Sequence, residues 1–339
     1  MNSTIGNGSI EFSSCFNATA RKIGQIIALS LILAGSLTAN SFIVLIVYKT
    51  PTLRKPINYF VANMAMSDLL YSIFWLPWRL SLMHTKSWLI GGQFGHTFCK
   101  LVPFFGDVPM IVSVQNLVLI AVDRFGAVVF PLRSPLIRSK LCPFFISATW
   151  IVAAAFISPH LFTYQLVEYS GQMLCEMRWT KAFGDSSSVA DYILAATILF
   201  TCIPVMVLVL LYSIILIKLK TQAHPGEQSA NIQQQRNKRN RNVLYMSIAI
   251  VLVFVFCWLP CSSNSLIIGY PTLARPRSMQ LSCGFGLYYD VMDYMAVGYC
   301  AINPIMCFVF SSNYRQGLKR LMNLVRPSYR RKVQKSAGY

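Results

Sequence analysis

Carboxylates inside long apolar stretches are the residues of this sequence best placed to do chemistry. Asp68 lies in one such stretch, and Asp107 lies near the end of another. A charge at bilayer depth costs several kcal/mol unless it is solvated or paired, so it predicts a functional site. Asp68 therefore predicts a buried water or ion pocket, the alternative being a protonated, hydrogen-bonded acid. Asp68 has no clustered histidines, cysteines or paired acids at its depth, so we expect no enzyme.

A second group of candidates lies at a helix end or at a break in a helix. Asp123 and Arg124 adjoin where an apolar stretch ends, and the neighbouring acid lets a guanidinium with five fixed donors stay near lipid depth. An ordinary interfacial arginine is the alternative. Pro260 and Pro304 each remove one backbone hydrogen bond from a helix, which leaves a point where that helix can bend.

The elements that position these residues must be membrane helices. The chain has 339 residues, of which 55% are hydrophobic and only 12% are charged, whereas a soluble domain is nearer a quarter charged. So few charges could not cover the surface of a soluble fold with this apolar excess. Ten cysteines are also too dilute for a disulfide scaffold. The sequence therefore predicts an integral membrane protein.

Segments of about 20 residues with little charge predict seven membrane helices, because irregular backbone cannot satisfy its hydrogen bonds in lipid. They run over Ile23–Tyr48, Ile57–Trp78, Leu101–Val122, Leu141–Val167, Tyr192–Ile217, Asn242–Ala274 and Tyr294–Phe310. The segments are continuous rather than alternating at period two, so a β-barrel is disfavoured. The predicted fold is an all-α seven-helix bundle over residues 23–310, an amphipathic membrane-surface helix over 311–325 and a basic tail over 326–339.

The charges orient this bundle. Of the 30 Lys and Arg residues, 21 fall on the odd-to-even connections and the C-terminal tail, with only Asp123 and Glu227 as acids there. Basic residues accumulate on the cytoplasmic side, so residues 1–22 are expected outside a plasma-membrane protein. The net charge of +19 is thus a topology signal, and nucleic acid is excluded as a partner. Three Asn-x-Ser/Thr glycosylation acceptors lie on the outer side, at Asn2, Asn7 and Asn17.

Four cysteines also fall on the outer side, in an oxidising compartment. They are Cys15, Cys99, Cys175 and Cys283. Four cysteines permit three pairings, and the sequence alone does not choose between them. Around Cys175, the alternating pattern of Gln165–Glu168 and the run Gln172–Trp179 predict a β-hairpin with its turn near Gly171.

Each predicted span carries a marker, and the set carries a resemblance. The markers are Asn40, Asp68, Cys99 with Asp123-Arg124-Phe125, Trp150 with Pro159, Pro204 with Tyr212, Phe254 with Cys257-Trp258-Leu259-Pro260, and Asn303-Pro304. Together they resemble the rhodopsin-like (class A) family of G-protein-coupled receptors, from about residue 23 to residue 325. Any one marker alone would be weak, whereas seven in the right order are highly specific.

The resemblance implies a route for activation. Arg124 would meet the C-terminal helix of a heterotrimeric G protein once the sixth span bends at Pro260 and swings outward. Phe254 and Trp258 are spaced i, i+4 on one face and would repack as a transmission switch, although plain aromatic packing fits the same spacing. The other implied switch residues are Asp123, Tyr212, Asn303 and Pro304.

The inner end departs from the family's pattern in two places. Residues 238–241 lack the acid that would close a salt bridge to Arg124, which favours higher basal activity. Cys307 stands where the family usually has a tyrosine. Any active-state water bridge from Tyr212 to that tyrosine must therefore be absent or rebuilt.

A sodium pocket is the one ion site that the resemblance implies. Asp68, Ser113 and Asn303 would supply its oxygens. A further family position, usually a small polar residue, is Tyr299 here, which argues against a full sodium shell. No other cofactor is expected.

The resemblance also selects among the outer cysteines. It implies a disulfide from Cys99 to Cys175, which pins the second outer loop to the third span. A second disulfide, from Cys15 to Cys283, would tie the N-terminus to the third outer loop, with free thiols as the alternative.

The outer face favours a basic ligand. Amine receptors of the family need an acid at position 106, which is Gly106 here, and opsins need a lysine that the seventh span lacks. The residues expected to bind the ligand are Asp107, Glu176, Trp179, Asp191, Trp258, Tyr289, Asp290 and Asp293. Like charges at i, i+3 repel unless a cation lies between them, as Asp290 and Asp293 would, although pairing with nearby basic residues would also neutralise them. A basic or amidated neuropeptide is predicted; a small non-peptide ligand or, less so, a transported solute is the alternative.

The C-terminal region indicates the remaining partners. Leu318, Leu321 and Met322 form an apolar stripe bordered by basic residues, which suits a helix lying on an anionic leaflet. Arrestin binding should be limited, because the tail offers few hydroxyls beyond Ser328 and Ser336.

Overall fold

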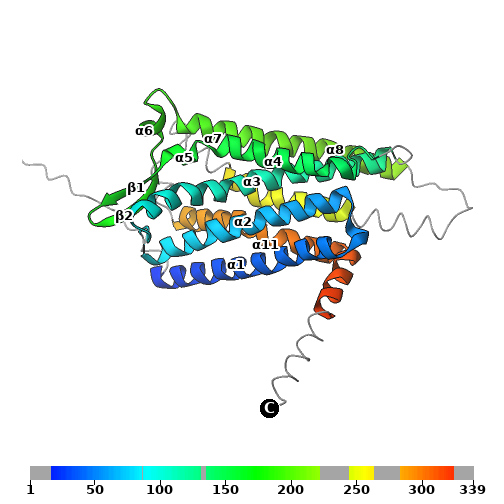
Figure 1. Cartoon of the computed structure of the whole chain (residues 1–339), viewed down its shortest axis with the longest axis horizontal. Helices are drawn as coiled ribbons and strands as arrows, with labels where there is room; N and C mark the ends of the chain where they lie inside the picture. Colours follow the sequence, from blue (N-terminus) through cyan, green and yellow to red (C-terminus); the bar gives the residue numbers. More distant parts are fainter. Residues whose placement is uncertain (1–16, 86, 131–134, 222–243, 263–282, 324–339) are drawn as a thin grey trace, which may run out of the picture.

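The computed structural model describes residues 17–85, 87–130, 135–221, 244–262 and 283–323. Long helices run side by side, and a two-stranded hairpin lies at one end of them (Figure 1). The elements in chain order are α1 (Ala18–Lys49), η2 (Pro51–Leu53), α2 (Pro56–Thr85), α3 (Gly92–Val129), η3 (Ser139–Leu141), α4 (Cys142–Ile157), α5 (His160–Thr163), β1 (Tyr164–Tyr169), β2 (Gln172–Met177), α6 (Trp179–Phe183), α7 (Val189–Thr197), η4 (Ile198–Cys202), α8 (Ile203–Thr221) and α11 (Cys283–Phe310). Two further helices run over Leu244–Ser262 and over residues 312–323; they are called helix 244–262 and helix 312–323.

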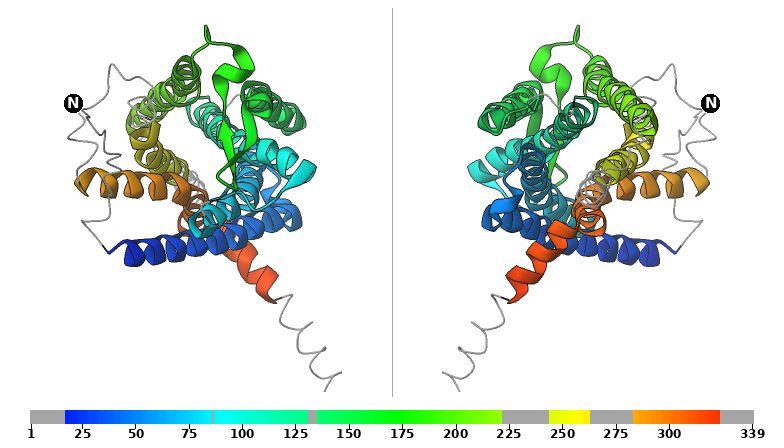
Figure 2. Two further views of the ribbon diagram at one scale, coloured as in Figure 1. Left: turned by 90° about the vertical axis from the view of Figure 1, so that its left-hand side faces the viewer. Right: turned by 90° about the vertical axis from the view of Figure 1, so that its right-hand side faces the viewer.

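Within these described residues, seven helical rods form the bundle, which confirms the predicted fold class. They are α1, α2, α3, α4, the continuous α7–η4–α8 rod, helix 244–262 and α11. α1 packs against α2 and α11, and α3 packs against α2, α4 and α8. α1 begins at the hairpin end and α11 finishes at the opposite end (Figure 1), as an odd number of crossings requires. End-on views show the rods grouped around the bundle axis with the hairpin across one mouth (Figure 2).

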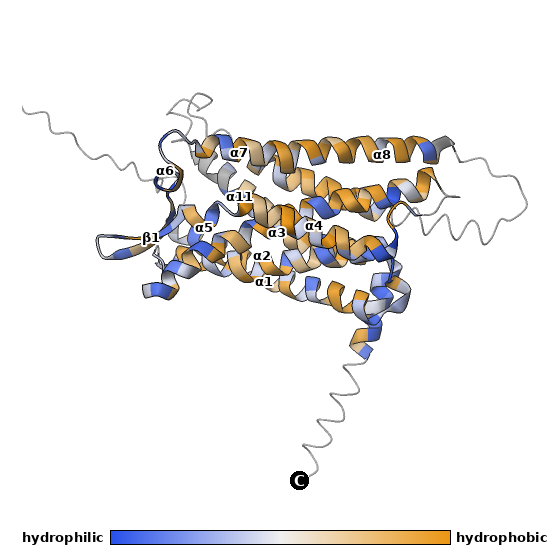
Figure 3. Ribbon diagram, turned by 45° about the horizontal axis from the view of Figure 1, so that its top comes forward, coloured by the Kyte–Doolittle hydropathy of each residue, from blue (hydrophilic) through white to orange (hydrophobic). Residues whose placement is uncertain are grey.

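The outer surface of the rods is apolar. Phe144 and Phe256, for example, point away from the bundle and are 68% and 71% exposed, and apolar residues cover the long helices (Figure 3). Six of the described helices are long and apolar enough to cross a membrane. α2, which carries Asp68 and Arg79, is not among them, but it packs against both α1 and α3. An apolar surface of this extent is stable in lipid, and the chain is a multi-pass membrane protein.

The predicted ends of some helices were wrong. α4 ends at Ile157 and α5 is a single turn, so the predicted fourth span is too long and residues 164–167 form the start of β1. Apolar composition does not distinguish a helix that continues from a strand that follows it. Other helices extend beyond the predicted spans, since α2 reaches Thr85, α3 begins at Gly92 and α11 begins at Cys283. The extensions of α2 and α3 contain polar residues such as Arg79, His84 and His96, and the extension of α11 contains Asp290 and Asp293, so the search for uncharged segments ended before these helices do.

The predicted hairpin is confirmed, with one change at its far end. β1 and β2 pair antiparallel from Tyr164 with Met177 to Tyr169 with Gln172. Ser170 and Gly171 form the turn with φ of 49° and 77°, which is the conformation that two-residue hairpins require and glycine adopts without strain. The second strand stops at Met177, so Trp179 begins α6 rather than extending the hairpin.

The fifth rod contains a wide turn. Residues Ile198–Cys202 form a π-helical segment between α7 and α8. Segments of this kind insert an extra residue into a helix and are frequent at functional sites. Thr201, inside the segment, is 8% exposed and faces the interior.

Helix 312–323 is attached by specific contacts to the end of the bundle opposite the hairpin. The Arg315 guanidinium donates to the carbonyl oxygens of Phe308 and Val309 at 2.9 and 2.6 Å, which satisfies carbonyls that the end of α11 leaves without partners. The Tyr314 hydroxyl donates to Asn58 Oδ1 at 3.0 Å, and its side chain is fully buried. Burial raises the pKa of this phenol well above its usual value.

Candidate functional site

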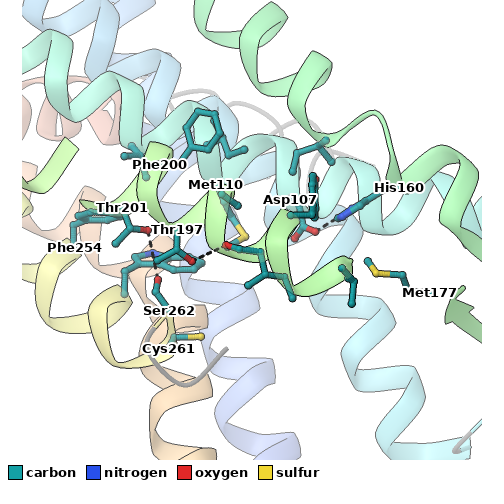
Figure 4. Close-up of a pocket in the computed structure, with 18 of the residues that line it drawn as sticks. Asp107, Met110, His160, Met177, Thr197, Phe200, Thr201, Phe254, Cys261 and Ser262 are labelled. Atoms are coloured by element: carbon teal, nitrogen blue, oxygen red, sulfur yellow. Dashed lines mark hydrogen bonds and ion pairs between the residues drawn. The ribbon is translucent and has the colours of Figure 1, made fainter. Parts of the chain in front are cut away.

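A cavity of about 310 Å³ lies between α3, the α7–η4–α8 rod and helix 244–262. The hairpin borders it through Tyr164 and Met177, so the cavity is near the mouth that the hairpin crosses. Its wall is mostly apolar and aromatic with a few polar groups, which is the usual composition of a ligand pocket. The polar groups used below are Asp107, His160, Thr201 and Ser262 (Figure 4).

Asp107 and His160 are the titratable pair of the cavity. His160 Nδ1 lies 3.2 Å from Asp107 Oδ2, with the two side chains 5% and 27% exposed, and they point toward one another in Figure 4. The rings of Tyr164 and Tyr192 lie 5.3 and 6.0 Å from the His160 ring. Asp107 was predicted and His160 was missed; the available signal was a polar ring at the end of an otherwise apolar span.

The other predicted acids lie outside this cavity. Asp290 pairs with the Arg21 guanidinium at 2.6 Å, and Asp293 pairs with Arg79. No cation bridges Asp290 and Asp293 in the described residues; each is neutralised by its own arginine. Both arginines come from other helices, so their pairing is visible only in the folded bundle.

Three predicted ligand residues lie in β2, α6 and α7 near the hairpin end of the bundle, and one has no described side chain. Glu176 lies 3.8 Å from Arg178. Trp179 packs against Tyr192 with ring centroids 4.9 Å apart. Asp191 is exposed in the first turn of α7, where negative charge suits the helix dipole. The Tyr289 side chain lies outside the described residues.

The wall of α3 explains why position 106 holds no acid. A Cβ atom on Gly106 would lie 2.6 Å from Trp75 Cε3, closer than real Cβ contacts allow. Gly106 therefore packs against the Trp75 indole of α2, and the next residue, Asp107, takes the acid into the cavity.

The floor of the cavity connects to the core of the bundle. Trp258 and Phe254 both line it, with ring centroids 6.4 Å apart. Thr201 Oγ1 and Ser262 Oγ lie 3.5 Å apart, which links the π segment to helix 244–262. Pro260 lies between Trp258 and Ser262 in the same helix, so a contact at the floor reaches the predicted bend.

The Asp68 cluster lies deeper in the bundle. Ser113 Oγ donates to Asp68 Oδ1 at 3.1 Å, and Asn303 Nδ2 donates to Asp68 Oδ2 at 3.0 Å. Ser67 Oγ lies 2.8 Å from Ser113 Oγ. A void of about 10 Å³ adjoins the cluster, and Tyr299 is part of its wall. The three predicted sodium ligands are thus brought together.

The predicted coupling residues lie toward the opposite end. Arg124 binds its neighbour Asp123 through Nε at 3.2 Å and through a second guanidinium nitrogen. Tyr212 and Phe254 are buried in the main core cluster, and Asn303 and Pro304 are buried in α11. Residues 238–241, which were expected to provide no acid for Arg124, lie outside the described residues.

The outer covalent sites are partly described. Cys99 and Cys175 form the predicted disulfide, which joins α3 to β2. Cys15 and the Cys283 side chain lie outside the described residues, as do Asn2 and Asn7. Asn17 is the N-cap of α1, where its Oδ1 accepts from the backbone N–H groups of Thr19 and Ala20 at 3.0 and 3.2 Å.

Comparison with known proteins gives consistent matches. The family described as 7 transmembrane receptor (rhodopsin family) matches residues 39–306. The RYamide receptor of Drosophila melanogaster is 28% identical over 304 residues, which are 87% of this chain and 62% of the receptor. Neuropeptide receptor 22 of Caenorhabditis elegans is 28% identical over 290 residues, 82% of this chain and 64% of the receptor. The chain thus spans less than two thirds of these two relatives. The trace amine-associated receptor 13c of Danio rerio is 27% identical over 92% of this chain and 90% of its own length.

Proposed function

The chain belongs to the rhodopsin family of seven-transmembrane receptors, and from this premise we propose that it binds an extracellular peptide and activates heterotrimeric G proteins. We expect this peptide to carry a basic side chain or a free amine, or to be amidated at its C-terminus. Two relatives whose names include RYamide and neuropeptide support a peptide ligand. We propose the plasma membrane as its location, with the N-terminus outside; the excess of basic residues on the connections at the other face supports this orientation.

Asp107 carries this proposal. It is the only acid among the described residues that line the cavity, and no lysine or arginine of the described residues pairs with it. A carboxylate in an apolar wall gains most from a cation that enters with the ligand, because the low dielectric strengthens a charge-assisted hydrogen bond. The rings of Tyr164 and Tyr192, which surround His160 beside it, provide faces for a cation as well.

The size of the cavity limits what enters it. Ligand pockets span roughly 300–1,000 Å³, so a cavity of about 310 Å³ is at the small end. We expect one end of the peptide to enter beside Asp107 and reach Trp258. The rest would lie on the outer surface, where the remaining predicted contacts are Glu176, Trp179, Asp191, Tyr289, Asp290 and Asp293.

The floor supports a mechanism for the signal. A ligand that packs better on Trp258 and Phe254 when helix 244–262 is bent at Pro260 will shift the population toward that bent form. The inner half of the helix then moves away from α3, and Arg124 exchanges Asp123 for the G protein. Tyr212, Asn303 and Pro304 would rearrange in the same step. Helix 312–323 would rest on the inner leaflet, and arrestin would bind weakly.

A screen of the full chain in cells tests this function. The chain would be expressed with a promiscuous G protein and exposed to basic and amidated peptides, with nucleotide exchange as the readout. Arg124→Ala should abolish exchange while binding of the active peptide at the cell surface persists. Loss of binding together with signalling, or loss of neither, would contradict the role given to Arg124.

A small amine is the alternative ligand. The small cavity with a single acid also suits such a molecule, and the trace amine-associated relative matches nearly the whole chain. The same cells would be exposed to a panel of aliphatic and aromatic amines. A peptide ligand should lose potency when Glu176 or Trp179 is replaced, since these lie outside the cavity, whereas a small amine should not.

A further inference from the structure

Both carboxylate oxygens of Asp68 already accept a hydrogen bond within the bundle. Each carboxylate oxygen accepts from a different side chain, Ser113 on α3 and Asn303 on α11. Asn303 presents its amide nitrogen to the acid, so it acts there as a donor and not as an oxygen ligand. Ser113 is also bound to Ser67. Ser113 Oγ and Asn303 Nδ2 are therefore engaged with the acid, whereas Asn303 Oδ1 is buried without a hydrogen-bond partner among the described residues.

The space beside the cluster is the second constraint. The adjoining void is about 10 Å³, which is near the minimum for a single water molecule. Hard cations in proteins take about six oxygen ligands, and those that the protein does not provide must be waters. A void of this size has no room for several waters around an ion.

Two side chains of α11 border the void where a sodium ion would need further oxygen ligands. Tyr299 and Cys300 both line the void from α11. Tyr299 is 4% exposed, and its ring meets Phe254 edge to face with centroids 5.7 Å apart. The Cys300 thiol donates to the Val297 carbonyl oxygen at 3.0 Å, and sulfur is a poor ligand for a hard cation.

We propose that Tyr299 closes the Asp68 cluster to sodium, so that this receptor has no sodium-dependent resting state. The Tyr299 ring occupies the volume that an ion and its waters would need and packs directly on Phe254 at the cavity floor. The contact between α11 and helix 244–262 at this depth is thus a fixed aromatic one, and external salt does not change it.

The test needs no ligand, because sodium itself is the probe. The purified full chain would be melted in sodium chloride and in choline chloride at equal ionic strength, with tryptophan fluorescence as the readout. A bound ion stabilises the folded state by mass action, whereas the wild-type chain should melt at the same temperature in both salts. Tyr299→Ser should open the void and gain a sodium-specific rise of about 2 °C or more.

Matched variants locate the effect. Tyr299→Phe keeps the ring and should stay insensitive to sodium, while Asp68→Asn placed in the Tyr299→Ser background should remove the gained response. A sodium-specific rise in the wild-type chain that Asp68→Asn abolishes would overturn the proposal. A folded Tyr299→Ser variant without any sodium response would overturn the role of Tyr299. If that variant does not fold, the wild-type and Asp68→Asn melts still decide the question.

Discussion

The outer cavity and the Asp68 cluster both hold an acid inside the bundle, but they treat it differently. Asp68 has two side-chain donors and a void of about 10 Å³. Asp107 has one partner, the imidazole of His160, which carries no charge unless it is protonated. Asp107 also lines the outer cavity of about 310 Å³. The two acids thus differ in burial, since Asp68 is 4% exposed and the Asp107 side chain is 27% exposed. They also differ in how far the protein's own side chains satisfy the carboxylate.

Replacing Asp68, whose two carboxylate oxygens both accept hydrogen bonds, should have the largest effect on stability. Asp68→Leu leaves the Asn303 amide donor buried without its acceptor and removes one of the two partners of Ser113, and such losses cost about 1–3 kcal/mol per group. We expect the free energy of unfolding to fall by about 2–5 kcal/mol, measured by thermal melting in detergent. Asp68→Asn keeps the shape and is the matched control. If Asp68→Leu were as stable as the wild-type chain, the hydrogen bonds of Asp68 would not stabilise the fold, and the contrast with Asp107 would fail.

Replacing Asp107, which lines the cavity, should affect ligand binding rather than stability. Asp107→Asn should reduce the potency of a basic ligand by about 10–100-fold, which corresponds to about 1.4–2.8 kcal/mol of a charge-assisted hydrogen bond. Its melting temperature should stay near the wild-type value, because Asn keeps the size of the side chain and His160 Nδ1 has no hydrogen-bond partner to lose among the described residues. Dose–response curves measure the effect, with Asp185→Asn as the control because Asp185 is exposed and is not among the predicted ligand contacts. Unchanged potency would remove Asp107 from the site.

The close packing of Gly106 on α3 against Trp75 on α2 offers a third test. Gly106→Ala brings a Cβ atom to 2.6 Å from Trp75 Cε3, so we expect a loss of about 1 kcal/mol or more from overpacking. Gly35→Ala is the control, since nothing lies within 4 Å of its Cβ position in α1 and alanine favours a helix. A stable Gly106→Ala variant would show that the indole can move.

The smallest effect is expected at the ion pairs of the mouth. The sequence predicts that Asp293→Asn weakens a basic ligand. However, Asp293 is bound to Arg79 with both side chains about one quarter exposed, and partly exposed pairs contribute about 0–1 kcal/mol. We expect less than a threefold change in potency, measured beside Arg79→Gln. If Asp293→Asn alone reduced potency tenfold, the ligand's cation would have to be assigned to Asp293 on α11 instead of Asp107.

Local patterns predicted much of the fold. The seven rods follow from apolar runs, and the hairpin follows from alternation around Gly171. The Cys99–Cys175 disulfide followed from the family resemblance and is confirmed. The end of the fourth span was placed too late, because the residues after Pro159 still include Leu161, Phe162 and Leu166, and only pairing with β2 makes residues 164–167 part of a strand.

Contacts between distant helices were harder to predict. The sequence placed Asp107, Asp290 and Asp293 together at the mouth, but their partners are His160, Arg21 and Arg79 on three other elements. Which acid keeps an opening beside it depends on how the helices are rotated. By contrast, Asp68, Ser113 and Asn303 were grouped correctly because each occupies a family position with a known neighbour.

The wide turn at Ile198–Cys202 affects how this receptor can be aligned with others. One additional residue in a helix rotates every later side chain by about 100°. Counting outward from Pro204 on an ideal helical wheel would therefore point the wrong side chains of the fifth rod toward a docked molecule. Contact maps copied from a relative with an unbroken helix would be out of phase above this turn.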